Sequence, residues 1–201
     1  MIVNGIDLLM AKPLKGMADG KQTYRGASHG LTEAGYDIRI KQEVRFRPHP
    51  LHLGMISNSV SDDNKIVTNF GRFVLASAIE EFQMPTDLVG IVHDKSTWAR
   101  HGLSVFNTVI EPGWTGFLTL ELVYHGQEEL IIPAGAGIAQ VLFHNTTRFA
   151  EYKGKFANQP NRPIGPRASA GTHCSVCGLG QFHSPGGITC PNGHGGADSI
   201  E

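Results

Sequence analysis

The heptapeptide Phe117-Leu-Thr-Leu-Glu-Leu-Val123 alternates between two kinds of side chain. Successive side chains of a β-strand point to opposite faces, so the three leucines form one apolar face. Thr119 and Glu121 then lie on the other face together with Phe117 and Val123, and Glu121 points away from the leucines. The heptapeptide therefore predicts a strand with one buried face and one acid on the opposite face. We expect that acid to face a pocket or a partner chain.

Short apolar runs separated by turn residues continue on both sides, from about residue 36 to residue 149, with few segments suited to a long amphipathic helix. This pattern predicts a mostly β fold, an antiparallel β barrel or a sandwich. A short helix is predicted within Asp94–Leu103, where Gly102 supplies a stop signal. The strands that we expect are Tyr36–Ile40, Val67–Ala76, Leu88–His93, Phe117–Val123 and Ile138–His144.

The composition indicates an ordinary globular protein, with 40% hydrophobic and 17% charged residues among 201. No apolar run reaches membrane-spanning length, and residues 1–20 do not resemble a signal peptide, so we expect a cytoplasmic protein with no membrane partner. The net charge of −1 provides no overall field to attract nucleic acid, which is therefore not an expected partner. Any polyanion has to be bound by a local cluster of charges.

The composition shifts after Tyr152 to Gly, Pro, Asn, Arg and Ser, which is typical of an extended arm rather than of a core. The length suits one compact domain, of about 100 to 150 residues, with an appendage. We therefore expect a β domain over residues 1–160, a linker over 161–172 and a small tail over 173–201.

The tail contains all three cysteines of the chain. An odd number of cysteines in a reducing cytosol argues against a closed disulfide framework. A Cys-x2-Cys pair followed by Cys-x3-His suits tetrahedral Zn²⁺, and such a small Gly-rich segment needs a staple of this kind to become ordered. A tail that binds no metal is the alternative. The expected zinc ligands are Cys174, Cys177, Cys190 and His194, with His173 and His183 as substitutes for the histidine.

Lys95-Ser96-Thr97 follows a predicted strand at the start of the predicted helix. Free backbone N–H groups, two hydroxyls and an ammonium group suit phosphate oxygens, but Ser and Thr are also common helix caps. Arg100, one turn further on, suits either a salt bridge or a second contact to an anion.

Thr108–Gly116 is rich in turn residues and enters the strand that carries Glu121. A turn beside a pocket can recognise a base through its backbone N–H and C=O groups, although an ordinary hairpin has the same pattern. A half-buried Glu121 carboxylate suits general base and acid chemistry on a water molecule; alternatively it pairs with an arginine.

Together these segments resemble the dCTP deaminases of the dCTP deaminase/dUTPase superfamily. The resemblance covers about residues 30 to 160, and the tail lies outside it. It implies a distorted antiparallel β barrel of the dUTPase type, and a homotrimer with active sites between subunits. The matching segments are Asp94–Leu103, Glu111–Glu121 and Gly137–Phe143, with Ala34–Arg39 upstream and Tyr152–Gln159 downstream.

The resemblance implies deamination of dCTP to dUTP and ammonia, with Mg²⁺ bound to the triphosphate and no catalytic zinc. Glu121 matches the glutamate that activates water for attack on C4 of cytosine, and Arg100 matches an arginine from a neighbouring subunit. Ser96 is also placed in the catalytic group, and Asp37 has a structural role. The implied substrate-binding residues are Lys95, Ser96, Thr97, Arg100, Thr108, Val109, Glu111, Trp114, Tyr152, Lys155 and Gln159.

Residues 152–160 match a lid that closes over the phosphates and expels water. Phe156 stands where many members have tyrosine, and Ala157-Asn158 replaces the commoner Gln-Gly pair, so this lid differs from theirs in detail.

Four other functions compete with this interpretation. A dUTPase is disfavoured by the surroundings of Glu121 and by the lack of a glycine-rich C-terminal motif, whereas a bifunctional enzyme that forms dUMP stays open. A zinc-dependent cytidine deaminase needs His-x-Glu, and no histidine here precedes glutamate in that way. A non-catalytic nucleotide-binding regulator is disfavoured because the glutamate, hydroxyls, arginine and lid lysine occur together.

Overall fold

The computed structural model describes residues 1–49, 51, 54–60, 65–166, 182–184 and 187–189. The chain divides into two compact units, Met1–Ile164 and Gly165–Glu201. The described part of the second unit is an antiparallel hairpin of β15 (Phe182–Ser184) and β16 (Gly187–Thr189). The predicted zinc ligands lie outside the described residues: Cys174, Cys177, Cys190 and His194, together with His173 and the side chain of His183.

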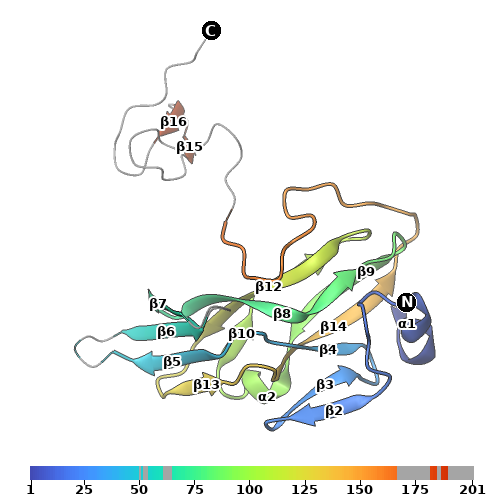
Figure 1. Ribbon diagram of the computed structural model, residues 1–201. Coiled ribbons are helices and arrows are strands. Elements are labelled where there is room, and N and C mark those ends of the chain that lie inside the picture. Colours follow the sequence, from blue (N-terminus) through green and yellow to red (C-terminus); the bar gives the residue numbers. More distant parts are fainter. Residues whose placement is uncertain (50, 52–53, 61–64, 167–181, 185–186, 190–201) are drawn as a thin grey trace. The chain divides into compact units, whose positions relative to one another are not determined.

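Three antiparallel sheets and two short helices make up the first unit (Figure 1). The first sheet has the order β11 (Val109–Ile110), β9 (Leu88–Asp94), β14 (Gly137–Asn145), β4 (Tyr36–Arg39), β3 (Ala27–Leu31) and β2 (Lys21–Tyr24), with β1 (Ile2–Val3) paired to β14. The second has the order β10 (Leu103–Val105), β12 (Thr115–Tyr124) and β8 (Phe73–Gln83). The third has the order β13 (Leu130–Ile132), β5 (Val44–Pro48), β6 (Met55–Val60) and β7 (Ile66–Phe70). The helices are α1 (Gly5–Ala11) and α2 (Ser96–Ala99).

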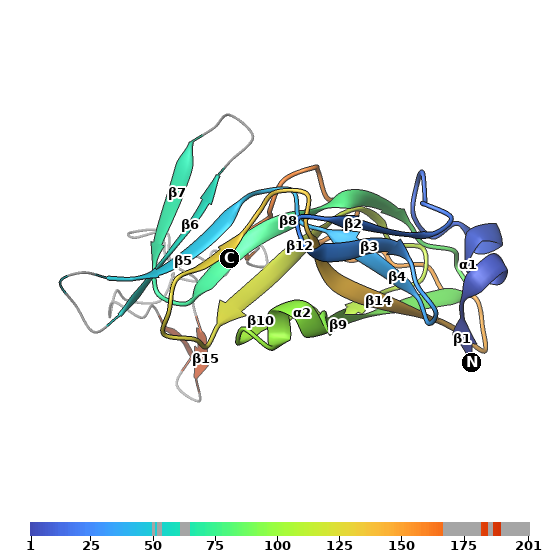
Figure 2. The same ribbon diagram turned by 90° about the horizontal axis from the view of Figure 1, so that it is seen from below.

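The predicted mostly β class is confirmed, and within the described residues the strands form open sheets rather than a closed barrel. An isolated bridge between Ile40 and Ala78 joins the first sheet to the second. Figure 2 shows the third sheet and α1 at opposite ends of the first unit. Within the described residues, no helix is both long and apolar enough to cross a membrane.

Four of the five predicted strands are confirmed, as β4, β9, β12 and β14. The prediction of one strand over Val67–Ala76 is wrong, because a turn at Gly71 separates β7 from β8. Gly71 has a φ of +129°, which residues with a side chain rarely adopt. The predicted helix is only one turn long, and the chain turns away from it at Gly102, whose φ is +84°.

The leucine face of β12 is buried as predicted, with Leu120 and Leu122 fully inaccessible to solvent. Leu118 is only partly buried, because a β-bulge shifts the pairing of β12 with β8 between Phe117 and Thr119. Thr119 is buried too, although the alternation places it on the open face. Its hydroxyl contacts the C-terminal segment of the first unit, which covers this part of β12.

Candidate functional site

Glu121 lies half-buried on the outer face of the second sheet. Its register partner on β8 is Leu75, and on the other side Phe106 N donates a hydrogen bond of 2.8 Å to Glu121 O. Directly opposed residues of antiparallel strands share a face, so two apolar side chains flank the carboxylate. Burial raises the pKa of Glu121, and no ion pair joins the carboxylate to another described residue. The alternative pairing with an arginine is therefore not formed within the described chain, and the group suits proton transfer.

Asn107 holds the backbone beside Glu121. Its Oδ1 accepts a hydrogen bond of 3.0 Å from Glu121 N, and its Nδ2 donates one of 2.6 Å to Thr119 O. The sequence analysis missed this residue, because asparagine is common in connecting segments and nothing local distinguishes this one.

Lys95 is the N-cap residue of α2, and its side chain points into the protein. The ammonium group contacts the Asp37 carboxylate and lies 2.8 Å from Ser28 Oγ, with only 11% of the side chain exposed. Ser96, Thr97 and Arg100 are exposed. The Lys95 side chain forms no cap, so the exposed hydroxyls and Arg100 can meet a ligand from outside, whereas Lys95 lies beneath them with its charge paired to Asp37.

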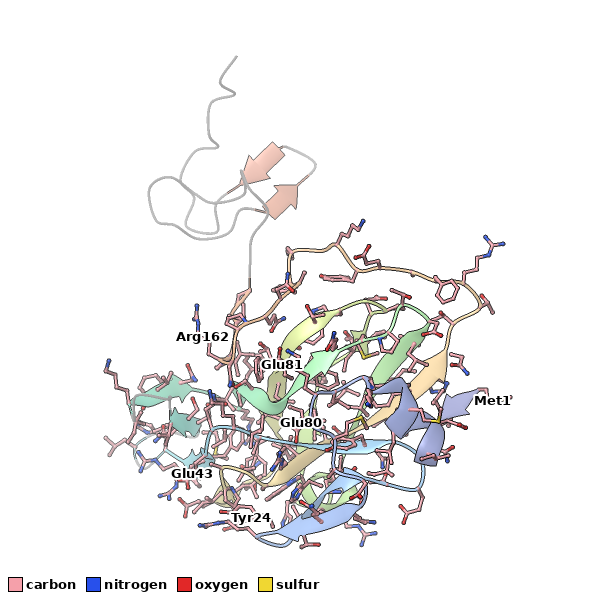
Figure 3. The ribbon with its side chains drawn as sticks, turned by 45° about the vertical axis from the view of Figure 1, so that its right-hand side comes forward. Met1, Tyr24, Glu43, Glu80, Glu81 and Arg162 are labelled. Carbon is pink, nitrogen blue, oxygen red and sulfur yellow. The ribbon has the colours of Figure 1, made fainter. Side chains whose placement is uncertain are left out.

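Asp37 belongs to a buried polar group on β3, β4 and β8. Its Oδ2 also accepts a hydrogen bond of 3.2 Å from Ser28 Oγ, whereas its buried Oδ1 has no partner among the described residues. Close by, Arg39 Nε lies 2.8 Å from Glu80 Oε1, and Glu80 lies inside the first unit (Figure 3). His29 is buried here as well, and burial, followed by the positive charge of Arg39, lowers its pKa.

Thr108, Val109 and Glu111 are exposed at the turn that precedes β12. Thr108 O accepts a hydrogen bond of 3.3 Å from Val92 N, which ties this segment to β9. Trp114 is instead 95% buried, where it packs edge-on against Phe82. Its indole N–H donates a hydrogen bond of 2.8 Å to Phe156 O, so within this chain Trp114 anchors the predicted lid.

The predicted lid, residues 152–160, runs along β12 of its own chain. Gln159 O accepts a hydrogen bond of 3.0 Å from Phe117 N, and Gln159 Oε1 lies 2.8 Å from Thr119 Oγ1. The backbones meet closely at Gly116, where a Cβ atom would lie 2.5 Å from Gln159 N. Tyr152 N donates to Pro112 O at 2.9 Å, and Lys155 lies over the Phe156 ring. The lid therefore lies near the strand of Glu121.

Asn158, one of the departures from the family pattern, has a φ of +54°. Asparagine tolerates this left-handed conformation better than most residues with a side chain, and its Oδ1 accepts a hydrogen bond of 2.5 Å from Thr115 Oγ1. The substitution therefore fits the turn in the lid.

The predicted site residues fall into two groups within one chain. Glu121, the Thr108 turn and the lid are associated with β12, whereas Lys95, Ser96, Thr97 and Arg100 lie at α2. Figure 1 shows α2 and the orange lid segment on different sides of the unit. No hydrogen bond or ion pair between described residues joins the α2 residues to Glu121 or to the lid. One chain alone thus does not gather the whole predicted site.

A groove of about 460 Å³ opens beside the Glu121 strand. Leu75, the register partner of Glu121, lines it together with Phe73, Phe70 and Pro163, but Glu121 itself does not. In the part of the chain that the structure describes, no three His, Cys, Asp or Glu side chains come together to hold a metal ion.

Comparison with known proteins finds a family model and relatives that this chain resembles. A dCTP deaminase-like family model matches residues 15–146. The dCTP deaminase of Acidobacterium capsulatum is 32% identical over 162 residues, which cover 73% of this chain and 88% of that protein. That of Campylobacter fetus subsp. fetus is 36% identical over 146 residues, which cover 66% of this chain and 77% of that protein. The solved structure of native EIAV dUTPase aligns with a TM-score of 0.42 at 19% identity, covering 72% of this chain and 95% of its own.

Proposed function

The chain belongs to the dCTP deaminase-like family, and we propose that it hydrolyses dCTP to dUTP and ammonia. The observation that carries this proposal is the family match over residues 15–146, which includes Glu121 and the α2 residues. The half-buried Glu121 carboxylate, with its raised pKa and apolar neighbours, supports it further.

In the proposed mechanism, Glu121 takes a proton from a water molecule whose oxygen bonds to C4 of cytosine. Glu121 then passes this proton to the amino nitrogen, the C4–N bond breaks and ammonia leaves. The proton of the new hydroxyl is transferred to ring nitrogen N3, which gives the C4 carbonyl and the N3–H group of uracil. A carboxylate with a raised pKa suits both steps, because it binds the proton more tightly than an exposed glutamate and still releases it.

The α2 residues supply the proposed triphosphate site. Exposed hydroxyls of Ser96 and Thr97, the Arg100 guanidinium and the charge of Lys95 suit phosphate oxygens, and Mg²⁺ is proposed to arrive with the nucleotide. Backbone groups of Thr108 and Val109 are proposed to meet the base. Tyr152, Lys155 and Gln159 belong to the proposed lid, while Glu111 and Trp114 stabilise the turn and anchor that lid.

We also propose a homotrimer with active sites between subunits, as the resemblance implies. The separation of α2 from the lid supports this arrangement, because a second copy can bring its α2 residues to the lid that lies along the Glu121 strand. The apolar outer face beside Glu121, with Phe73 49% exposed and Phe106 57% exposed, is also suited to being covered by another copy.

A product assay tests the proposed activity. Purified protein with Mg²⁺ and dCTP is expected to accumulate dUTP and ammonia, separated by chromatography, and EDTA is expected to slow the reaction. Parallel reactions with dUTP, dCMP and dCDP define the specificity. Formation of dUMP and pyrophosphate from dCTP establishes the bifunctional variant instead. If every substrate is unchanged while nucleotide still binds, the protein is a regulator and not an enzyme.

The tail is proposed to bind one structural Zn²⁺ through Cys174, Cys177, Cys190 and His194. The β15–β16 hairpin supports this, because in the sequence it lies between the two pairs of ligands. We expect about one zinc per chain by elemental analysis, lost when Cys174 and Cys177 are both changed to Ser and retained in the His173→Ala control. Deamination should persist in the zinc-free variant. Protein that binds no zinc at neutral pH contradicts the proposal.

A further inference from the structure

The connection between β10 and β11 crosses from one sheet to another beside Glu121. Val105 is the last residue of β10 in register with β12, opposite Leu122. The next residue, Phe106, still donates a backbone hydrogen bond from its N–H group to Glu121 O, but it is no longer part of β10. By Val109 the chain has joined the first sheet, where it pairs with Ile91. The backbone of residues 106–108 therefore leaves β12 at the level of Glu121.

This departure removes the backbone C=O and N–H groups that would continue the hydrogen-bond ladder along β12. In an antiparallel ladder, every second pair of opposed residues exchanges two backbone hydrogen bonds, and the bond from Phe106 N to Glu121 O makes these two residues such a pair. Phe106 and Glu121 form only one of the two, so Glu121 N–H needs another acceptor. Thr119 C=O, two residues earlier on the same edge of β12, needs another donor.

The side chain of Asn107 satisfies both groups. Its Oδ1 accepts from Glu121 N at 3.0 Å and its Nδ2 donates to Thr119 O at 2.6 Å. A carboxamide carries both an acceptor and donors, so the Asn107 side chain replaces the C=O and N–H groups that β10 would have presented to β12 had its backbone continued. No aliphatic side chain can do this, and a carboxylate offers only acceptors.

On its other side, β12 pairs in regular register with β8 from Thr119 to Val123, including Glu121 with Leu75. The irregularity in this pairing lies further back, between Phe117 and Thr119. The Asn107 amide links the backbones of Thr119 and Glu121 on the β10 side of β12. Asn107 also directly precedes Thr108, whose backbone is proposed to meet the base. Asn107 thus connects the base-binding segment and the strand of the general base directly.

We infer that Asn107 is a positioning residue, which sets the Glu121 carboxylate against the base-binding segment Thr108–Val109. The inference rests on the proposed function of Glu121. Asn107 contacts the backbone of Glu121 and not its carboxylate. Its proposed role is therefore to align the carboxylate with the base, and not to bind dCTP or to change the protonation of Glu121. Its loss is therefore expected to lower kcat much more than it raises KM for dCTP.

The decisive variant is Asn107→Leu, which has a similar volume and neither hydrogen bond. We expect kcat for dCTP to fall roughly 10- to 100-fold, as misplacement of reacting groups by about 1 Å does, with KM changed less than about threefold. Binding of dUTP and the circular dichroism spectrum check that the variant folds. Asn58→Leu, at a half-buried asparagine on β6, is the matched control and should keep the original kcat.

Asn107→Asp provides a rescue. The ionised side chain has no donor for Thr119 O, but the protonated carboxylic acid has an acceptor and a donor again. We expect the ratio of kcat in this variant to kcat in the wild-type protein to rise towards one as the pH is lowered. A constant ratio across the pH range overturns the inference.

The remaining outcomes separate this inference from the proposed function. A folded Asn107→Leu protein with unchanged kcat, or one with a raised KM and unchanged kcat, overturns the positioning role, and so does a loss confined to thermal stability. Glu121→Gln is measured in parallel. If it is inactive while Asn107→Leu is fully active, only the positioning role fails; if it is fully active, the proposed base fails and the inference fails with it.

Discussion

Glu121→Gln is expected to lower kcat for dCTP deamination roughly a thousandfold while nucleotide binding persists, since general acid–base catalysis typically contributes about 10²- to 10⁴-fold. The amide cannot accept the proton of the attacking water, whereas its size matches that of the carboxyl group. The measurement is steady-state kinetics, with dUTP binding followed separately by calorimetry. Glu81→Gln on β8 is the control, because that carboxylate pairs with Lys15 at 2.5 Å outside the proposed site.

Glu121→Gln is also expected to change how the stability of the folded protein depends on pH. Burial raises the pKa of Glu121 above that of the unfolded chain, so the folded protein binds this proton more tightly. The stability that this proton contributes is fully present below the unfolded pKa and is lost as the pH rises through the folded pKa. Glu121→Gln has no proton to lose, so its stability relative to the wild-type protein is expected to increase with pH across this window. Urea unfolding at several pH values measures the difference, and a difference independent of pH would argue against a buried, proton-binding carboxylate.

Mixing experiments extend this prediction to the proposed trimer. Arg100→Ala is expected to be inactive because it lacks a phosphate contact, and Glu121→Gln is expected to be inactive because it lacks the general base. If Arg100 and Glu121 of one site come from different subunits, co-refolded mixed trimers regain part of the activity, because some sites contain neither substitution. Mixed trimers that stay inactive would place both residues of each site in one chain.

Asp37→Ala is expected to destabilise the protein by about 3 to 5 kcal/mol, the usual result of removing one partner from a buried ion pair. Only 2% of the Asp37 side chain and 11% of the Lys95 side chain are exposed, so water cannot replace the lost carboxylate. Denaturant unfolding measures the loss. Asp19→Ala, at an exposed aspartate, is the matched control and should change the stability by less than about 0.5 kcal/mol.

The double variant Asp37→Leu with Lys95→Met tests the cause of that loss. Replacing a buried ion pair by apolar side chains is often neutral or stabilising, so the double variant is expected to recover most of the stability. A double variant as unstable as Asp37→Ala would point to lost packing around Asp37 and Ser28 rather than to an unpaired charge.

Local patterns in the sequence were enough to predict the mostly β class, four of the five expected strands, and the burial of the leucine face opposite Glu121. These features depend on the alternation of neighbouring side chains, which the chain carries without reference to its tertiary partners. The wrong prediction over Val67–Ala76 came from an apolar run that continues through a turn. There, a single glycine with positive φ outweighed the β propensity of its neighbours.

The tertiary structure alone decided how the site residues are held. Thr119 is buried because β12 has a bulge next to it and the C-terminal segment of the first unit covers it. Lys95 points inward because its ammonium group pairs with Asp37 on another strand. The role of Asn107 exists only because β10 turns away from β12 at that level. Each of these contacts joins segments distant in the chain. Their pairing depends on register, bulges and crossings between sheets, which no local pattern of side chains specifies.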